Sequence, residues 1–248
     1  MKHMALHVEV CVTSVEEALA AEACGADTVE LCTWLACGGV TPSSGLVDAV
    51  RSAVRIPVRV LVRPTPGGFV YAEAAIHALL TDAEILGGGA IGLVTGALLE
   101  AGEANMDLMA AVKRIAPESE ITFHRAMDHA MDPIEVLDAC MALAIERILT
   151  SGGATFALDG AARLKELVAR AGDRLVIAAA GGINGTNVVE LIERTGVQEV
   201  HFAAQLPKGA TPHAVAMSST NQGVSFEVEP DRAKIEGVMN ALVKAGLR

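Results

Sequence analysis

Short apolar runs of this sequence carry polar residues at alternating positions. Five runs share the pattern, and their polar residues are Glu9 and Cys11, Glu30 and Cys32, Arg59 and Arg63, Thr122 and His124, and Glu199 and His201. Successive side chains of a strand point to opposite faces, so each run predicts a strand with one apolar and one polar face. Strands of a parallel sheet covered on both faces are nearly continuous apolar runs instead. The pattern therefore predicts that several strands direct polar side chains into one shared interior.

Strand-like and helix-like segments alternate along the whole chain. The expected strands are residues 8–12, 28–31, 58–62, 90–94, 120–123, 147–150, 175–179 and 199–202. Ser14 with Glu17 predicts a capped helix start, and Asp132 followed by Pro133 predicts another. Eight strand–helix units in an unbroken series favour a closed (β/α)8 barrel of the TIM type over an open doubly wound sheet. The 248 residues also match the roughly 250 typical of such a barrel.

The chain is expected to form a single barrel domain over residues 1–248, with an addition after the last strand. Residues 205–229 are polar and small, and predict a long loop; residues 231–244 predict an extra C-terminal helix. A loop of that length in a compact domain is usually functional, interfacial or mobile. It is also where an interaction scaffold would make its contacts.

Composition narrows the classes of partner. The net charge of −11 opposes binding to a phosphate backbone, and the 3% of aromatic residues leave little for base stacking, so no nucleic acid is expected. No apolar run has the length of a membrane span, and no nucleotide cofactor is indicated. The five cysteines are an odd number without a Cys-x-x-Cys pair, which is typical of reduced thiols. We therefore expect a cytoplasmic protein with no membrane partner.

Acid–base groups gather where the predicted strands end, which is where barrels of this type carry their active sites. If the protein is an enzyme, the candidate catalytic residues are His124, His201, Glu9, Glu30 and Asp128. Histidines and carboxylates at one mouth are suited to general acid–base catalysis. The alternative is an interior network of ion pairs that only fills the barrel, since unpaired interior charges are costly.

Glycines and arginines at the same strand ends predict an anion site. Its candidate residues are Arg63, Arg125, Ser151, Gly152, Gly153, Gly181 and Gly182. Barrels often bind phosphate in the last βα loops, where glycines let backbone N–H groups approach the anion. Arginine adds charge-assisted hydrogen bonds to a phosphate or carboxylate. The alternative is that the glycines only form tight turns.

Cys11 and Cys32 are the candidate metal ligands. Each follows a glutamate by two residues on consecutive strands, which predicts Glu9 and Glu30 in one interior layer and both thiols in the next. Neighbouring strands would bring the two sulfurs close together. Two soft thiolates are suited to Cu(I) rather than to a hard cation. Alternatively, both cysteines are small buried hydrophobic residues.

The same positions resemble the CutC family of copper homeostasis proteins. The matching segments lie within about residues 6–204, and they are residues 9–11, 25–32, 38–43, 63–64, 122–128, 147–153, 181–183 and 201. The resemblance implies a cytoplasmic TIM-type barrel, usually a homo-oligomer, linked to copper handling. In that family Cu(I) binding is ascribed to the cysteine pair that Cys11 and Cys32 match, and no reaction is firmly established.

The chain departs from the family pattern on the predicted anion-binding side. After Arg63 and Pro64, Thr65 stands where the family usually has a second arginine. Before Gly181, Ala180 stands where the family tends to have a proline and a further glycine, and after His201, Ala203 stands where small hydroxyl residues are commoner.

The sequence leaves two hypotheses for the function of the protein. The first is a copper homeostasis protein that binds Cu(I) at the barrel mouth. The second is an enzyme that acts on a small anionic metabolite, phosphorylated or carboxylated, by His/Glu acid–base chemistry.

Overall fold

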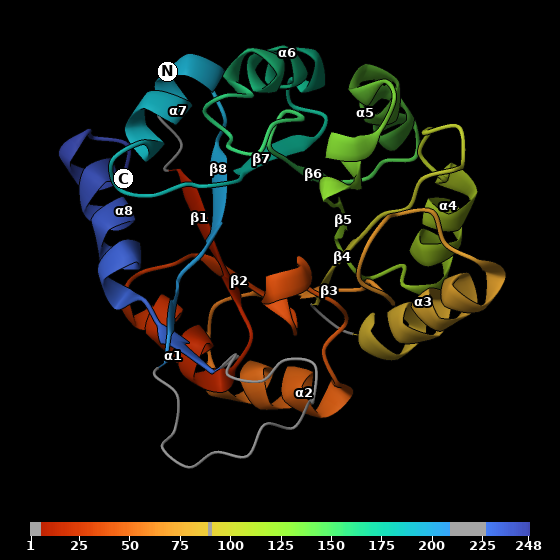
Figure 1. Cartoon of the computed structure of the whole chain (residues 1–248), viewed down its shortest axis with the longest axis horizontal. Coiled ribbons are helices and arrows are strands. Elements are labelled where there is room, and N and C mark those ends of the chain that lie inside the picture. Colours follow the sequence, from red (N-terminus) through yellow and green to blue (C-terminus); the bar gives the residue numbers. More distant parts are fainter. Residues whose placement is uncertain (1–5, 89–90, 209–226) are drawn as a thin grey trace.

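The protein is a closed barrel of eight parallel strands, paired in the order of the sequence (Figure 1). The structure is a computed structural model, and it describes residues 6–88, 91–208 and 227–248. The strands are β1 His7–Val12, β2 Thr28–Leu31, β3 Val58–Leu61, β4 Gly92–Thr95, β5 Ile121–Phe123, β6 Arg147–Thr150, β7 Val176–Ala180 and β8 Glu199–Ala203. Pairing of β1 with both β2 and β8 closes the ring. The predicted (β/α)8 barrel is confirmed.

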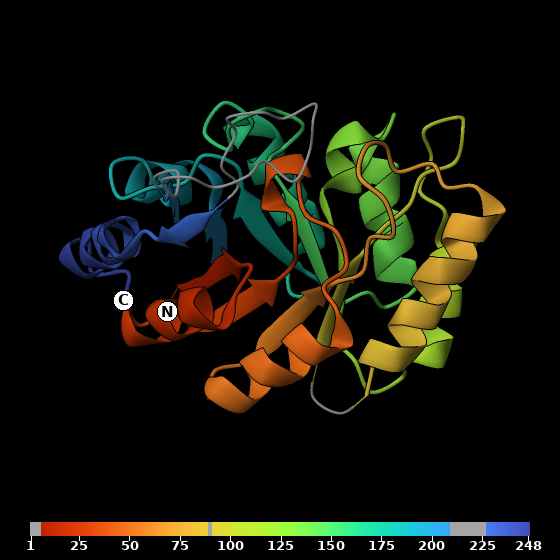
Figure 2. The same ribbon diagram turned by 60° about the horizontal axis from the view of Figure 1, so that its bottom comes forward.

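A ring of helices covers the barrel (Figure 2). The helices are α1 Val15–Ala23, α2 Ser44–Ala53, α3 Glu73–Leu86, α4 Met106–Ile115, α5 Pro133–Ala142, α6 Ala161–Ala171, α7 Val188–Thr195 and α8 Arg232–Lys244, with short 3-10 turns η1 Leu35–Cys37 and η2 Arg125–His129. Ser14 accepts a hydrogen bond from the Glu17 backbone N–H at the start of α1, and Asp132 caps α5 directly before Pro133. Both predicted helix starts are confirmed.

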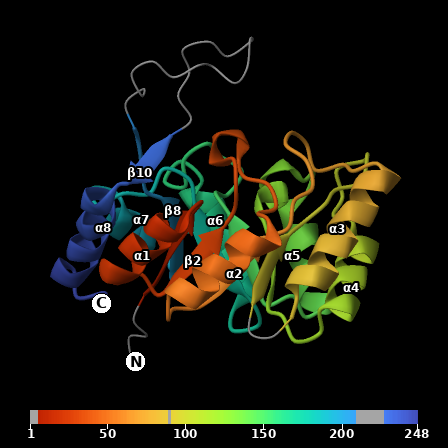
Figure 3. The same cartoon turned by 90° about the horizontal axis from the view of Figure 1, so that it is seen from below.

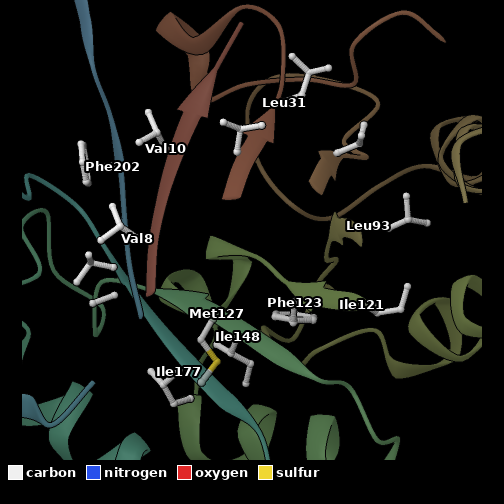
Figure 4. Close-up of a cluster of buried hydrophobic side chains, with 14 of the residues drawn as sticks. Val8, Val10, Leu31, Leu93, Ile121, Phe123, Met127, Ile148, Ile177 and Phe202 are labelled. Carbon is white, nitrogen blue, oxygen red and sulfur yellow. The ribbon is translucent and has the colours of Figure 1, made fainter. Parts of the chain in front are cut away.

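The two faces of each strand pack in different places. Outward side chains form the hydrophobic core between strands and helices, as Figure 4 shows for Val10, Leu31, Phe123 and Ile148. Inward side chains fill the barrel with the polar residues of the alternating pattern and with a small apolar cluster that includes Leu61. The alternation in the sequence is thus the alternation between core and barrel interior.

Strand bounds and the C-terminal segment differ in detail from the sequence predictions. The fourth strand begins at Gly92, whereas the pattern predicts a start at residue 90, which lies outside the described residues. The predicted loop 205–229 is not irregular at its ends, because β9 Gln205–Pro207 and β10 Val228–Pro230 pair as antiparallel strands. They lie at the loop end of the barrel (Figure 3). Residues 209–226 of that loop lie outside the described residues. The expected C-terminal helix is α8.

Within residues 6–88, 91–208 and 227–248, every helix is too short or too polar to span a membrane.

Candidate functional site

Charged residues deep in the barrel form a closed network of ion pairs. Glu9 accepts from Arg59 at 2.6 Å and from Arg147 at 2.6 Å. Glu199 accepts from the same two arginines, at 2.9 and 2.8 Å. Arg59 also reaches Glu120, at 3.0 Å. These residues therefore match the alternative interpretation from the sequence, in which an ion-pair network fills the barrel.

Burial makes this network strongly interdependent. Arg147 is only 1% exposed, and it is the largest fully buried side chain among the described residues. Burial alone would raise the pKa of Glu9, but Arg147, His201 and Arg59 hold that pKa well below its ordinary value. A buried charge that keeps its partners is tolerated, whereas one that loses them is costly.

Strand stagger places the glutamates differently from the sequence prediction. The predicted layer holds Glu9 beside Glu30, with both cysteines in the layer above. The register instead pairs Cys11 with Glu30, and Glu9 with His201. Strands of a closed barrel are tilted and shifted along their neighbours, so equal spacing in sequence is not equal height. The correction puts the Glu30 carboxylate at the level of the Cys11 thiol.

A pocket of about 510 Å³ opens at the carboxyl ends of the strands. Of the residues predicted for the site, eight line it: Cys11, Glu30, Arg63, His124, Arg125, Gly181, Gly182 and His201. Glu9, Cys32, Asp128, Ser151, Gly152 and Gly153 do not line it. The structure therefore brings together one residue of the metal pair, most of the acid–base candidates and part of the anion set.

The two candidate metal ligands lie side by side below the pocket. The sulfurs of Cys11 and Cys32 are 3.6 Å apart, and both cysteines are free thiols. Cys11 is 3% exposed and lines the pocket, whereas Cys32 is 0% exposed, behind it. The pKa of Cys11 is raised well above its usual range, because the hydrogen bond with Cys32, burial and the nearby Glu30 all oppose the thiolate.

Glu30 and His201 flank the Cys11 thiol. The Sγ of Cys11 lies 4.0 Å from Glu30 Oε1, and Glu30 Oε2 is buried without a hydrogen-bond partner among the described residues. Burial raises the pKa of Glu30; His201 opposes the rise and Glu9 adds to it. His201 Nδ1 lies 2.8 Å from Glu9 Oε1. Burial alone would lower the pKa of His201, but Glu30 and Glu9 raise it above its ordinary value.

His124 is a neutral imidazole on the opposite wall of the pocket. Its Nδ1 accepts from the Ala126 backbone N–H at 3.3 Å, so the ring proton lies on Nε2. That Nε2 is buried and has no partner among the described residues. Burial and the charge of Arg63 lower the pKa of His124 to about 3. Gly96 leaves room for the ring, since a Cβ there would lie 2.6 Å from Nδ1. At neutral pH His124 is therefore a hydrogen-bond donor rather than a base.

Arg63 supports the rim of the pocket. Its guanidinium donates to the carbonyl oxygens of Cys37, Gly39 and Gly67, at 3.2, 2.7 and 2.6 Å. The guanidinium also lies 5.1 Å from the centre of the Phe69 ring. The side chain therefore holds the segment around Cys37 and Gly39 against the loop that contains Gly67, and it places a positive charge at the pocket wall.

The loop after β6 already holds an anion of its own. The Asp128 carboxylate accepts from the backbone N–H groups of Ser151 and Gly153, each at 3.0 Å, and from Arg125 at 2.7 Å. The Gly152 N–H donates to Thr150 Oγ1 at 2.9 Å. The N–H groups predicted for a bound anion are thus occupied by a side chain. Of the predicted glycines, Gly181 and Gly182 are the pair that lines the pocket.

Several residues that line the pocket do not lie at the ends of strands, so the sequence prediction missed them. Cys37 ends the short turn η1, Phe69 comes from a loop, His129 ends the short turn η2, and Lys234 comes from α8. Lys234 donates to the Ala203 carbonyl oxygen at 2.6 Å, which ties the extra helix to the end of β8. Only the placement of the extra helix brings Lys234 there, and no spacing in the sequence signals it.

The fold and the pocket define a (β/α)8-barrel protein with thiol, carboxylate and imidazole groups at its C-terminal mouth. The CutC family model matches residues 6–206. The chain is 41% identical over 243 residues to the human copper homeostasis protein cutC homolog, covering 96% of this chain and 89% of that protein. It is 43% identical over 199 residues to a family protein CutC of Xylella fastidiosa, covering 80% and 74%. The chain therefore belongs to the CutC family.

Solved structures agree with this assignment. The crystal structure of a CutC protein from Streptococcus agalactiae matches with a TM-score of 0.74 at 26% identity, over 79% of this chain and 98% of that one. Phosphoribosyl anthranilate isomerase from Thermotoga maritima matches with a TM-score of 0.54 at 16% identity, over 96% and 99%. The second likeness reflects the barrel fold alone.

Proposed function

We propose that this protein takes part in copper homeostasis by binding Cu(I) at the barrel mouth, through Cys11 and Cys32. The observation that carries the proposal is the 3.6 Å separation of two free sulfurs, of which that of Cys11 lines the pocket and that of Cys32 lies behind it. Zinc–thiolate bonds are about 2.3 Å long, and with metal–sulfur bonds of about that length two sulfurs at this spacing can both bind one ion. Thiolates are soft ligands that select Cu(I). The human relative carries the name of a copper homeostasis protein.

The surroundings of the pair favour a protected ion. Leu61 and Val94 pack with both cysteines in one apolar cluster, and Leu35 lies against it. Cu(I) held there is shielded from water on the Cys32 side and approached from the pocket on the Cys11 side. Such a site is suited to a stored or transferred cargo ion.

Anaerobic titration against a Cu(I) chelator tests this proposal. The parent protein is expected to withdraw one Cu(I) per chain from the chelator, and the Cys11→Ser/Cys32→Ser variant to withdraw none. Cys140→Ser is the matched control, because Cys140 is a buried thiol on α5. Binding by the double variant as tight as that of the parent would place the copper site elsewhere.

A second function has an observation of its own. The buried Nε2 of His124 and Oε2 of Glu30 have no partner among the described residues, although both residues line the pocket. An orphaned buried polar atom is costly and is satisfied when a ligand binds. These groups support an enzyme acting on a small anionic metabolite, in which neutral His124 donates to the substrate and Arg63 supplies positive charge.

Thermal shift with phosphorylated and carboxylated metabolites tests the second function. A true ligand is expected to stabilise the parent protein and to lose this effect in His124→Asn, which keeps the acceptor for Ala126 but removes the Nε2 donor. No stabilisation by any member of the panel would count against an enzyme.

Compartment and assembly complete the proposal. We place the protein in the cytoplasm as a homo-oligomer, in keeping with five free cysteines and with the resemblance to its family. Light scattering of the purified chain checks assembly, and fractionation of the source cells checks the compartment. A monomer at micromolar concentration would remove the oligomer from the proposal.

A further inference from the structure

Cys11, Glu30 and His201 bring three different ligand atoms to one point. The three residues come from β1, β2 and β8, which are consecutive around the closed barrel. Their thiol, carboxylate and imidazole ligand atoms all lie within 4.8 Å of one another. All three residues line the pocket, so an ion held by them would face the open space. Cys32 does not line the pocket.

Glu30 lacks the partners that the other interior carboxylates have. Glu9 and Glu199 each accept from both Arg59 and Arg147, whereas no ion pair within the described residues reaches Glu30. Glu30 is 4% exposed, and its Oε2 has no hydrogen-bond partner among the described residues. A buried carboxylate is normally paired or coordinates a metal. A cation beside Glu30 would supply the missing charge.

His201 is oriented as metal-bound histidines usually are. Its Nδ1 is engaged by Glu9 Oε1 at 2.8 Å, which leaves Nε2 for a ligand in the pocket. Glu9 is itself fixed by Arg59 and Arg147. Carboxylate–histidine–metal arrangements of this kind set the tautomer and the ring orientation. The deep ion-pair network therefore holds the imidazole in place for coordination.

We infer that Cys11, Glu30 and His201 form a three-ligand site for a borderline divalent ion of the Zn²⁺ class, with its fourth position open to the pocket. Zinc accepts thiolate, imidazole and carboxylate together, and sites with three protein ligands keep the fourth position for water or substrate. The site shares only Cys11 with the Cu(I) pair. It goes beyond the proposed function, because it holds whether or not Cys32 binds copper.

Anaerobic titration with Co²⁺, a coloured substitute for Zn²⁺, tests the inference. The parent protein is expected to bind one Co²⁺ with a thiolate charge-transfer band and the visible bands of tetrahedral cobalt. Glu30→Gln and His201→Gln are expected to weaken binding by more than the roughly 10–100-fold typical of losing an outer partner. Cys140→Ser is the matched control and is expected to bind Co²⁺ like the parent, because Cys140 is a buried thiol on α5 outside the pocket.

Two outcomes would overturn the site. One is parent protein that binds no Co²⁺. The other is binding that survives in Glu30→Gln and His201→Gln but is lost in Cys32→Ser. X-ray absorption of Zn²⁺-loaded parent protein removes any dependence on variants that fold poorly: one sulfur per zinc is expected, and two sulfurs contradict the inference. Loss of Cu(I) binding in Cys32→Ser with Co²⁺ binding intact would separate this site from the copper site.

Discussion

The interior of the barrel and its mouth differ in how their buried carboxylates are paired. In the depth, Glu9 and Glu199 share Arg59 and Arg147 in a closed set of ion pairs. At the mouth, Glu30 and His124 each carry a buried polar atom with no partner among the described residues. Both regions come from the same alternation of polar and apolar residues. Ion pairing, rather than polarity, therefore separates the carboxylates of the deep network from the Glu30 carboxylate at the mouth, which has no ion pair within the described residues.

The largest expected effect comes from breaking the deep network. Arg147→Met should lower the free energy of unfolding by about 3–5 kcal/mol, because Glu9 and Glu199 lose a buried partner. Urea denaturation of the two proteins measures the difference. The control is Arg194→Met, which removes an exposed pair with Glu190 and should cost about 1 kcal/mol or less. Equal losses for the two variants would contradict a structural role for the network.

A smaller loss is expected where the Gly39 backbone packs against Cys32. Gly39 has a φ of +84°, and a Cβ there would lie 2.8 Å from Leu61 Cδ2 and 3.2 Å from Cys32 Sγ. Gly39→Ala should cost about 1–3 kcal/mol of stability, through backbone strain and overpacking, and should also weaken Cu(I) binding. Gly67→Ala is the control, because its φ is also positive but no heavy atom lies within 4 Å of its Cβ position. If both variants weaken Cu(I) binding equally, the Gly39 backbone does not shape the copper site.

The pH dependence of stability sharpens the comparison at His124. Its folded-state pKa of about 3 lies below the ordinary 6.5, so between these values the unfolded chain binds a proton that the folded one does not. The stability tied to neutral His124 is therefore complete above the unfolded pKa and is lost as pH falls towards 3. His124→Asn should flatten the fall between pH 6 and 4 by up to about 1.4 kcal/mol per pH unit. Urea denaturation midpoints of both proteins between pH 4 and 6 measure this difference. An unchanged dependence of stability on pH in His124→Asn would contradict the lowered pKa of His124.

The smallest effect is expected at the mouth. Glu30→Gln keeps the shape of the side chain and removes a carboxylate that has no ion pair among the described residues. Its free energy of unfolding should stay within about 0.5 kcal/mol of the parent value, or rise. The same urea measurement that reports on Arg147→Met decides this. A loss as large as that of Arg147→Met would make Glu30 part of the structural network.

Much of this arrangement could be predicted from the sequence because strand periodicity is local. Period-two alternation correctly directs Glu9, Cys11 and His201 inward. Short-range capping chemistry correctly starts helices after Ser14 and Asp132. These features depend on neighbours a few residues away, so one chain is enough to find them.

The rest depends on contacts between distant segments. Stagger of the closed barrel, which no single strand encodes, sets Cys11 level with Glu30. Asp128 accepts from the backbone N–H groups after β6 only because η2 folds back against that loop. Arg147 stands at the first position of β6, where the run of apolar residues gives no parity to interpret. Sequence patterns find the polar residues, but only tertiary contacts show which of them are already paired.

Cys11 and Cys32, whose sulfurs lie 3.6 Å apart, are proposed to hold copper at the barrel mouth. X-ray absorption at the copper edge, on anaerobically loaded parent protein, tests it most directly by counting sulfur neighbours. Binding by Cys11 and Cys32 predicts two sulfur neighbours per Cu(I), because both thiolates are bound to the same ion. One sulfur per Cu(I), or none, would contradict the claim.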